Sequence, residues 1–266
     1  MSWLVDVPVL LTIPLFALCA AILAVLAQLA FRRFVPAEAL REQHDFVAAL
    51  LSVVGVLYSV VLGFLVGTVW TSFDAAQQNA DQEARYAAIA YSFAADLPEP
   101  QRARVRHLIK EYALEVRDVE WEMMRHGEID PRANALVEEA TQTVLTMPAP
   151  AGALPGQALR TETIMAATVQ NLRRTAENRV IRVTESRQRL PSVVFEALLL
   201  GALLVVAYAL FFGSKRVWIQ LTTTALLAAC IGLFFGLIVD LNSPYAGPIR
   251  VSPDTWDAVI SGMRTL

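Results

Sequence analysis

The chain has 266 residues, of which 56% are hydrophobic and 18% charged, and its mean hydropathy is +0.47. Soluble domains average about 45–50% apolar and about 25% charged residues, so this composition indicates a membrane protein. The formal net charge of −3 gives no reason to expect nucleic acid as a partner. Cys19 and Cys230 lie inside apolar runs, where we expect small buried hydrophobic side chains and neither a disulfide nor a metal site. We expect no metal and no cofactor.

The first apolar run extends from about residue 5 to residue 30, which is long enough to cross a bilayer. No Lys or Arg precedes it and no small-residue cleavage site follows a short apolar core, so we expect a retained helix and not a signal peptide. The connector that follows carries Arg32, Arg33 and Arg41.

Residues 46–73 form an uncharged segment of 28 residues, longer than a membrane span requires. Small and mildly polar residues recur in it near four-residue spacing and therefore share one face of a helix. They are Ser52, Gly55, Ser59, Gly63, Gly67 and Thr71. One interpretation is a seam where helices pack closely, and the other is a face that lines a permeation path. The sequence leaves both open.

Residues 74–190 are charged and helical in pattern, without a further span. We expect the central helix to continue to about Ala95, because neither Pro nor Gly interrupts it. Leu108 and Tyr112 lie on an apolar face of a helix over 105–123, which we expect to be buried. Asp130 followed by Pro131 predicts the start of another helix. A long helix from about 157 to 189 then leads back to the membrane.

Two further spans, at about 191–212 and 217–241, are joined by a tight turn and followed by a short tail. Glu196 lies about one turn inside the third span, and Asp240 lies at the end of the fourth. Because a charge inside a membrane is costly, both carboxylates are candidate functional residues. Both are also close to helix ends, where a solvated carboxylate at the membrane border is an equally good interpretation.

These elements predict an all-α integral membrane protein, with four transmembrane helices in two hairpins that flank a helical extramembrane domain. The expected divisions are 1–73 for the first hairpin, 74–190 for the domain, 191–241 for the second hairpin and 242–266 for the tail. We expect a multi-pass protein of the cell's inner (plasma) membrane, in contact with lipid. The sequence contains no phosphate-binding loop, nucleophile elbow or zinc-protease motif, so we expect no enzyme.

Three short motifs resemble the bestrophin-like domain family of prokaryotes, a distant relative of the bestrophin chloride channels. The first is Leu62-Gly63-Phe64 leading into W-x-x-F at 70–73, and the second is Leu190-Pro191 at the start of the third span. The third is P-Y-x-G at 244–247, which Asn242 precedes. The resemblance covers the whole chain in layout.

This resemblance implies a homo-oligomeric channel for small anions, pentameric in bestrophins, with the second span lining the pore. Val56, Val60 and Phe64 match the apolar neck residues of the bestrophin helix, and the face beside them carries Ser52, Ser59, Gly63 and Gly67. Two of the three neck positions are valine here, whereas the bestrophin neck is more aromatic. No counterpart of the acidic calcium-binding segment follows the last span, so calcium gating is not expected.

Two orientations of the chain in the membrane and two functions are compatible with the sequence. The positive-inside rule applied to the short loops, which carry Arg32, Arg33, Arg41, Lys215 and Arg216, places the 74–190 domain outside the cell. The resemblance implies a cytosolic domain, and the cluster from Arg179 to Arg189 supports it. The alternative function is a membrane-anchored sensor or scaffold whose helical domain binds a partner.

Overall fold

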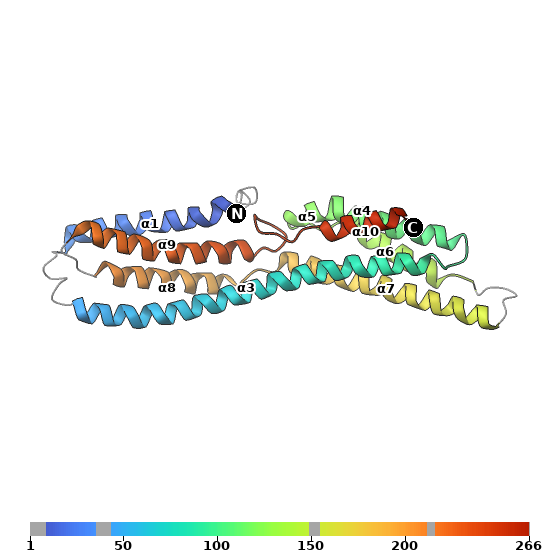
Figure 1. Cartoon of the computed structure of the whole chain (residues 1–266), viewed down its shortest axis with the longest axis horizontal. Coiled ribbons are helices and arrows are strands. Elements are labelled where there is room, and N and C mark those ends of the chain that lie inside the picture. Colours follow the sequence, from blue (N-terminus) through green and yellow to red (C-terminus); the bar gives the residue numbers. More distant parts are fainter. Residues whose placement is uncertain (1–8, 36–43, 149–154, 212–215, 266) are drawn as a thin grey trace. The chain divides into compact units, whose positions relative to one another are not determined.

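The structure is a computed structural model that describes residues 9–35, 44–148, 155–211 and 216–265 (Figure 1). Every regular element in these ranges is a helix, and four of the helices are long and apolar enough to cross a membrane. The predicted helical class and the four membrane-capable helices are therefore confirmed. The expected start of the first span, at residues 5–8, lies outside the described residues.

The chain divides into two compact units. The first unit comprises Met1–Ser72, Arg189–Ser243 and Gly247–Ile249, and contains α1 (Val9–Phe34), α8 (Ser192–Leu210), α9 (Val217–Leu241) and the first part of α3 (His44–Ala94). The second unit comprises Phe73–Gln188, Pro244–Ala246 and Arg250–Leu266. It contains the rest of α3 together with α4 (Gln101–Glu115), η2 (Val116–Glu120), α5 (Trp121–Arg125), α6 (Pro131–Leu145), α7 (Pro155–Arg187) and α10 (Asp254–Thr265).

In the first unit, α1 packs most extensively against α9, at the other end of the chain (Figure 1). The two helices run antiparallel, because the Thr12 hydroxyl donates to Asp240 (2.8 Å) at one end of the pair and the Thr224 hydroxyl donates to Gln28 (3.3 Å) at the other. Polar side chains thus hold both ends of an otherwise apolar contact. The arrangement in two sequential hairpins is not confirmed, since these helices are not neighbours in sequence.

Glycine allows α1 and α9 to approach closely at the centre of this contact. A Cβ added to Gly232 would lie 2.6 Å from the carbonyl oxygen of Phe16 and 2.7 Å from the Cβ of Ala20. Small residues at helix contacts are typical of membrane proteins, where van der Waals packing replaces the hydrophobic effect between helices.

The second unit has a conventional apolar core. Leu108 and Tyr112 are buried on α4, as predicted, and Asp130 caps α6 by accepting from the amides of Arg132 and Ala133. The central helix continues to Ala94, close to the predicted end. The helix expected over 105–123 is instead interrupted by the π-helical turn η2, which no Pro or Gly in the sequence signals.

One expectation from composition is wrong. Cys19 and Cys230 were expected to be buried, but both are exposed on the surface of the chain. An apolar run in a membrane helix exposes much of its surface to lipid, so membership of such a run does not imply burial within one chain.

Candidate functional site

Helix α3 is held to the rest of the chain by one side only. Four residues on that side, spaced by seven and therefore by about two helical turns, are all buried. They are Leu62, Val69, Ala76 and Glu83. Because residues two turns apart point the same way, the opposite side of the helix is left without cover by this chain.

The three residues matched to the channel neck lie on that open side. The exposed fractions of Val56, Val60 and Phe64 are 63%, 65% and 74%. Their four-residue spacing places them one above another along one face. The structure thus brings these three together as a column of apolar side chains with no covering element among the described residues.

The stripe of small residues is also open. A Cβ added to Gly55, Gly63 or Gly67 would meet nothing within 4 Å. The stripe therefore does not pack against another described helix of the same chain, and both interpretations, a packing seam and a face along a permeation path, stay predictions. Contact with another molecule and exposure to a permeation path both remain.

The hydroxyls of this stripe bond to their own helix. Ser52 donates to the carbonyl of Ala48 and Ser59 to the carbonyl of Val56, each at 2.8 Å. Their protons are therefore engaged, and the stripe presents oxygen atoms and backbone and no free donor.

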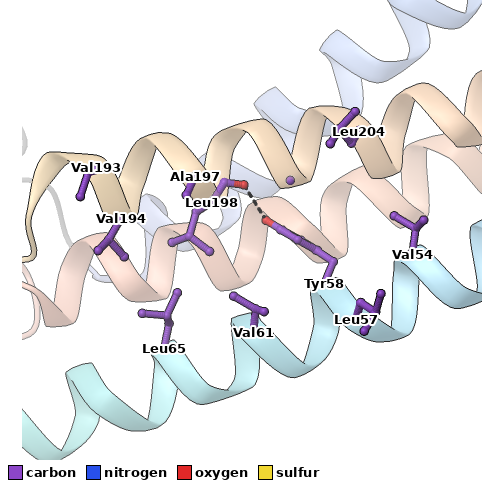
Figure 2. A pocket seen from close by; sticks show the side chains of 11 residues that line it. Val54, Leu57, Tyr58, Val61, Leu65, Val193, Val194, Ala197, Leu198 and Leu204 are labelled. Atoms are coloured by element: carbon purple, nitrogen blue, oxygen red, sulfur yellow. Dashed lines mark hydrogen bonds between the residues drawn. The ribbon is translucent and has the colours of Figure 1, made fainter.

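An apolar groove of about 550 Å³ lies between α3 and α8, beside the open face (Figure 2). Side chains of both helices line it, among them Leu57, Val61 and Leu204. The Tyr58 hydroxyl is its polar member, and it donates to the carbonyl of Leu198 (3.1 Å). The Tyr58 ring packs where α8 has Gly201, since an added Cβ there would lie 2.7 Å from the ring.

The two candidate carboxylates have different surroundings. Asp240 is buried on α9 and accepts the hydrogen bond from Thr12 (2.8 Å), so the structure gives it a partner inside the first unit. Glu196 is exposed on α8, and it makes no hydrogen bond or ion pair with any described residue. The two lie on different helices and do not form one site.

The second unit contains a buried ionic cluster that the sequence pattern did not predict. Arg182 binds both carboxylate oxygens of Glu83 (2.6 and 3.0 Å) and one oxygen of Glu120 (2.6 Å). Arg179 binds Glu120 in turn (2.5 and 3.2 Å), and the Tyr112 hydroxyl donates to Glu83 (2.7 Å). Arg182, Glu83 and Glu120 are fully buried. The cluster joins α3, α4, η2 and α7.

The contacts within this cluster shift the pKa of two of its members, Arg182 and Tyr112. Burial acts to lower the pKa of Arg182, but the charges of Glu83 and Glu120 outweigh it and hold that pKa well above its usual value. Burial, followed by the charge of Glu83, raises the pKa of Tyr112 well above 10.0, so its hydroxyl stays a donor. Two arginines and two glutamates therefore compensate one another as ions.

This cluster corrects one argument about orientation. Arg179 and Arg182 were counted among cations that flank the membrane, but both are buried in ion pairs. The signal that could have revealed the cluster is Glu83, which occurs between Ala80 and Ala84 in a run of alanines at helical spacing. A carboxylate on a small-residue seam requires a buried cation as its partner.

Comparison with known proteins identifies the family of this chain. A sequence model of the Bestrophin-like domain matches residues 18–256. The chain belongs to the bestrophin-like family. No curated protein matches the chain in sequence.

Solved bestrophin homologues share the fold. A bacterial bestrophin homologue from Klebsiella pneumoniae, carrying a leucine-to-threonine mutation, aligns with a TM-score of 0.64 at 10% identity, over 94% of this chain and 98% of that one. A tyrosine-to-alanine variant from the same organism gives 0.61 at 9% identity, over 96% and 97%. These alignments show that the chain shares the bestrophin-like fold, and its membrane-capable helices are consistent with a place in a membrane.

No metal centre is evident in the described ranges. No group of three or more His, Cys, Asp or Glu side chains there could hold an ion.

Proposed function

We propose that this bestrophin-like protein assembles as a homo-oligomeric ion channel of the inner membrane, with the open face of α3 lining the pore. Val56, Val60 and Phe64 would form successive apolar rings at the neck, beside the stripe of Ser52, Ser59, Gly63 and Gly67. Residues 74–190 would form the extramembrane domain, between the hairpin sequences 1–73 and 191–241, and Arg250–Leu266 of the 242–266 tail would belong to that domain, as it does to the second unit.

The observation that carries this proposal is the exposure of the neck residues. Phe64 is 74% exposed on a span that the rest of the chain covers on one side only. A single chain does not enclose this column, so several copies must surround it to make a pore. Rings of apolar side chains can gate such a pore by dewetting.

The kind of ion and the number of copies come from the family resemblance. It implies conduction of small anions and a pentamer, and no residue of the uncharged 46–73 segment supplies a charged selectivity ring. Selectivity would then depend on neck size and on groups outside this segment. Calcium gating is not part of the proposal.

Two measurements on the purified protein test this function. Its mass in detergent should correspond to several copies, and liposomes that contain it should pass chloride faster than empty liposomes. A cation gradient in place of the chloride gradient tests selectivity. A strictly monomeric protein, or an oligomer that passes no ion, would leave the sensor or scaffold as the better assignment.

A further inference from the structure

Glu196 is an exposed carboxylate on an apolar face of α8. It lies about one turn inside the helix, and Val193, Leu200 and Leu203 around it are also exposed. None of the described side chains pairs with it. A charge among lipid-facing side chains is costly unless a partner or water compensates it, so a partner from outside the chain is needed.

Two hydrogen bonds of the first unit show at which end of it Glu196 lies. A cationic partner must lie at the same depth in the membrane. The Leu190 amide donates to the Asn242 side chain (2.8 Å), so the start of α8 lies beside the end of α9. The Gln28 side chain donates to the carbonyl of Leu210 (3.3 Å), so the end of α8 lies beside the end of α1. Glu196 therefore lies at the Asn242 end of the first unit.

One described cation of the first unit lies at that same end. Arg32 and Arg33 occupy the last turn of α1 and Arg216 precedes α9, all at the opposite end. Arg189 directly precedes the Leu190 amide that bonds to Asn242. Subunits related by rotation about an axis along the membrane normal keep equal depths, so Glu196 of one copy can meet Arg189 of the next but none of the other three.

We propose that Glu196 forms an ion pair with Arg189 of the neighbouring copy and thereby fixes the subunit contact. This inference rests on the homo-oligomer of the proposed function. The contact is of the head-to-tail type, since each copy gives its carboxylate to one neighbour and its guanidinium to the other.

The surroundings of both residues favour this pair. Val193 and Ala197, on either side of Glu196 along α8, line the apolar groove beside α3. A neighbouring copy seated against that surface would exclude water and strengthen the charge attraction. Arg189 is exposed on the single chain, so a neighbouring copy can reach its guanidinium. Arg189 also interacts within its own chain, and a guanidinium with five donor hydrogens can serve both partners.

Charge reversal tests the pair. Glu196→Arg places two cations at the contact and should raise the protein concentration at which half of the oligomer dissociates by about tenfold or more. Arg189→Glu should do the same, and the double variant Glu196→Arg with Arg189→Glu should recover most of the loss. Glu162→Arg, at an exposed position of α7, is the control and should leave assembly unchanged.

Mixed disulfides test contact between copies directly. In a background of Cys19→Ser and Cys230→Ser, chains with Glu196→Cys are co-expressed with chains carrying Arg189→Cys. The pair predicts a disulfide-linked dimer that forms from the mixture faster than from either chain alone.

The outcomes of these experiments distinguish a failure of the proposed ion pair from a failure of the proposed channel function. If Glu196→Arg assembles like the parent, the proposed ion pair is wrong. It is also wrong if the loss of assembly in the double variant equals the sum of the losses in the single variants and no mixed disulfide dimer forms. In that case lipid headgroups or water solvate Glu196, and the channel proposal stands. A parent protein that is strictly monomeric would instead overturn the proposed function itself.

Discussion

At the scale of single residues, the ionic cluster around Arg182 is the most consequential feature of the second unit. Its charges are fully buried, so each ion depends on its partners for compensation in place of water. Such a cluster adds little net stability over an apolar core. Removing the side chain of one member, however, strongly destabilises the fold, because the other members remain charged and buried.

We therefore expect Arg182→Met to lower the free energy of unfolding by about 3–5 kcal/mol, since Glu83 and Glu120 lose their shared cation. Arg104→Met is the control, because Arg104 pairs with Glu139 where both side chains are exposed, and we expect about 1 kcal/mol or less. Denaturant unfolding of the two variants against the parent measures the difference. Equal losses would mean that the cluster is not a buried unit.

Glu185 predicts a pH dependence of stability. Burial raises the pKa of its carboxyl above 4.5, although the hydrogen bond from Asn79 (2.6 Å) opposes this, and its second oxygen has no partner. A raised folded pKa means that the contribution to stability is complete below pH 4.5 and is lost as the pH rises through the folded pKa.

Glu185→Gln should remove this loss, because the amide stays neutral at every pH. The melting temperature of the variant should therefore exceed that of the parent more at pH 7.5 than at pH 4.5. Thermal unfolding at the two pH values checks this, and a difference that is equal at both, or larger at pH 4.5, would contradict it.

At the scale of elements, glycines serve two different purposes. Gly232 meets the backbone of α1, whereas Gly63 on α3 faces open space. We expect Gly232→Ala to destabilise the first unit by about 1–3 kcal/mol, because its new Cβ would press on the carbonyl of Phe16. Gly63→Ala should leave the stability of the single chain unchanged.

Thermal unfolding in detergent distinguishes the two substitutions. A lower oligomer fraction for Gly63→Ala, at an unchanged melting temperature of the chain, would indicate that this stripe packs against a neighbouring copy. A Gly232→Ala protein as stable as the parent would contradict the close approach of α1 and α9.

The sequence predicted those elements whose signals are local. Apolar length revealed the four spans, and the absence of Pro and Gly predicted that α3 runs past residue 73. Pairing in space could not be predicted, because Thr12 and Asp240 are 228 positions apart. The cluster of Glu83, Glu120 and Arg182 was missed for the same reason, and because η2 gives no sequence signal. The open column of Val56, Val60 and Phe64 was anticipated through family resemblance, and its role as a neck stays a prediction.

At the scale of the whole molecule, orientation in the membrane is set by competing charges. With Arg179 and Arg182 neutralised by buried glutamates, the loop cations Arg32, Arg33 and Arg216 weigh more in the positive-inside balance. The family resemblance still favours a cytosolic second unit, and we adopt that orientation.

A cysteine at Glu138, which is exposed on α6, tests it. In a background without Cys19 and Cys230, Glu138→Cys should resist a membrane-impermeant thiol reagent in intact cells and react after lysis. Equal labelling in intact and lysed cells would reverse the orientation.

The proposed channel function requires that the open face of α3 lines a pore. If so, Phe64→Ala removes the largest apolar side chain from the neck, and the wider, better hydrated constriction passes ions faster. Phe234→Ala is the matched control, since it removes the same side chain from an exposed position on α9.

The decisive measurement is ion flux in liposomes at matched oligomer content. If the open face of α3 lines a pore, the flux for Phe64→Ala should be several-fold above that of the parent, with assembly intact, and Phe234→Ala should show parental flux. Parental flux for Phe64→Ala together with a lowered melting temperature would contradict it, because Phe64 would then be an ordinary packing residue.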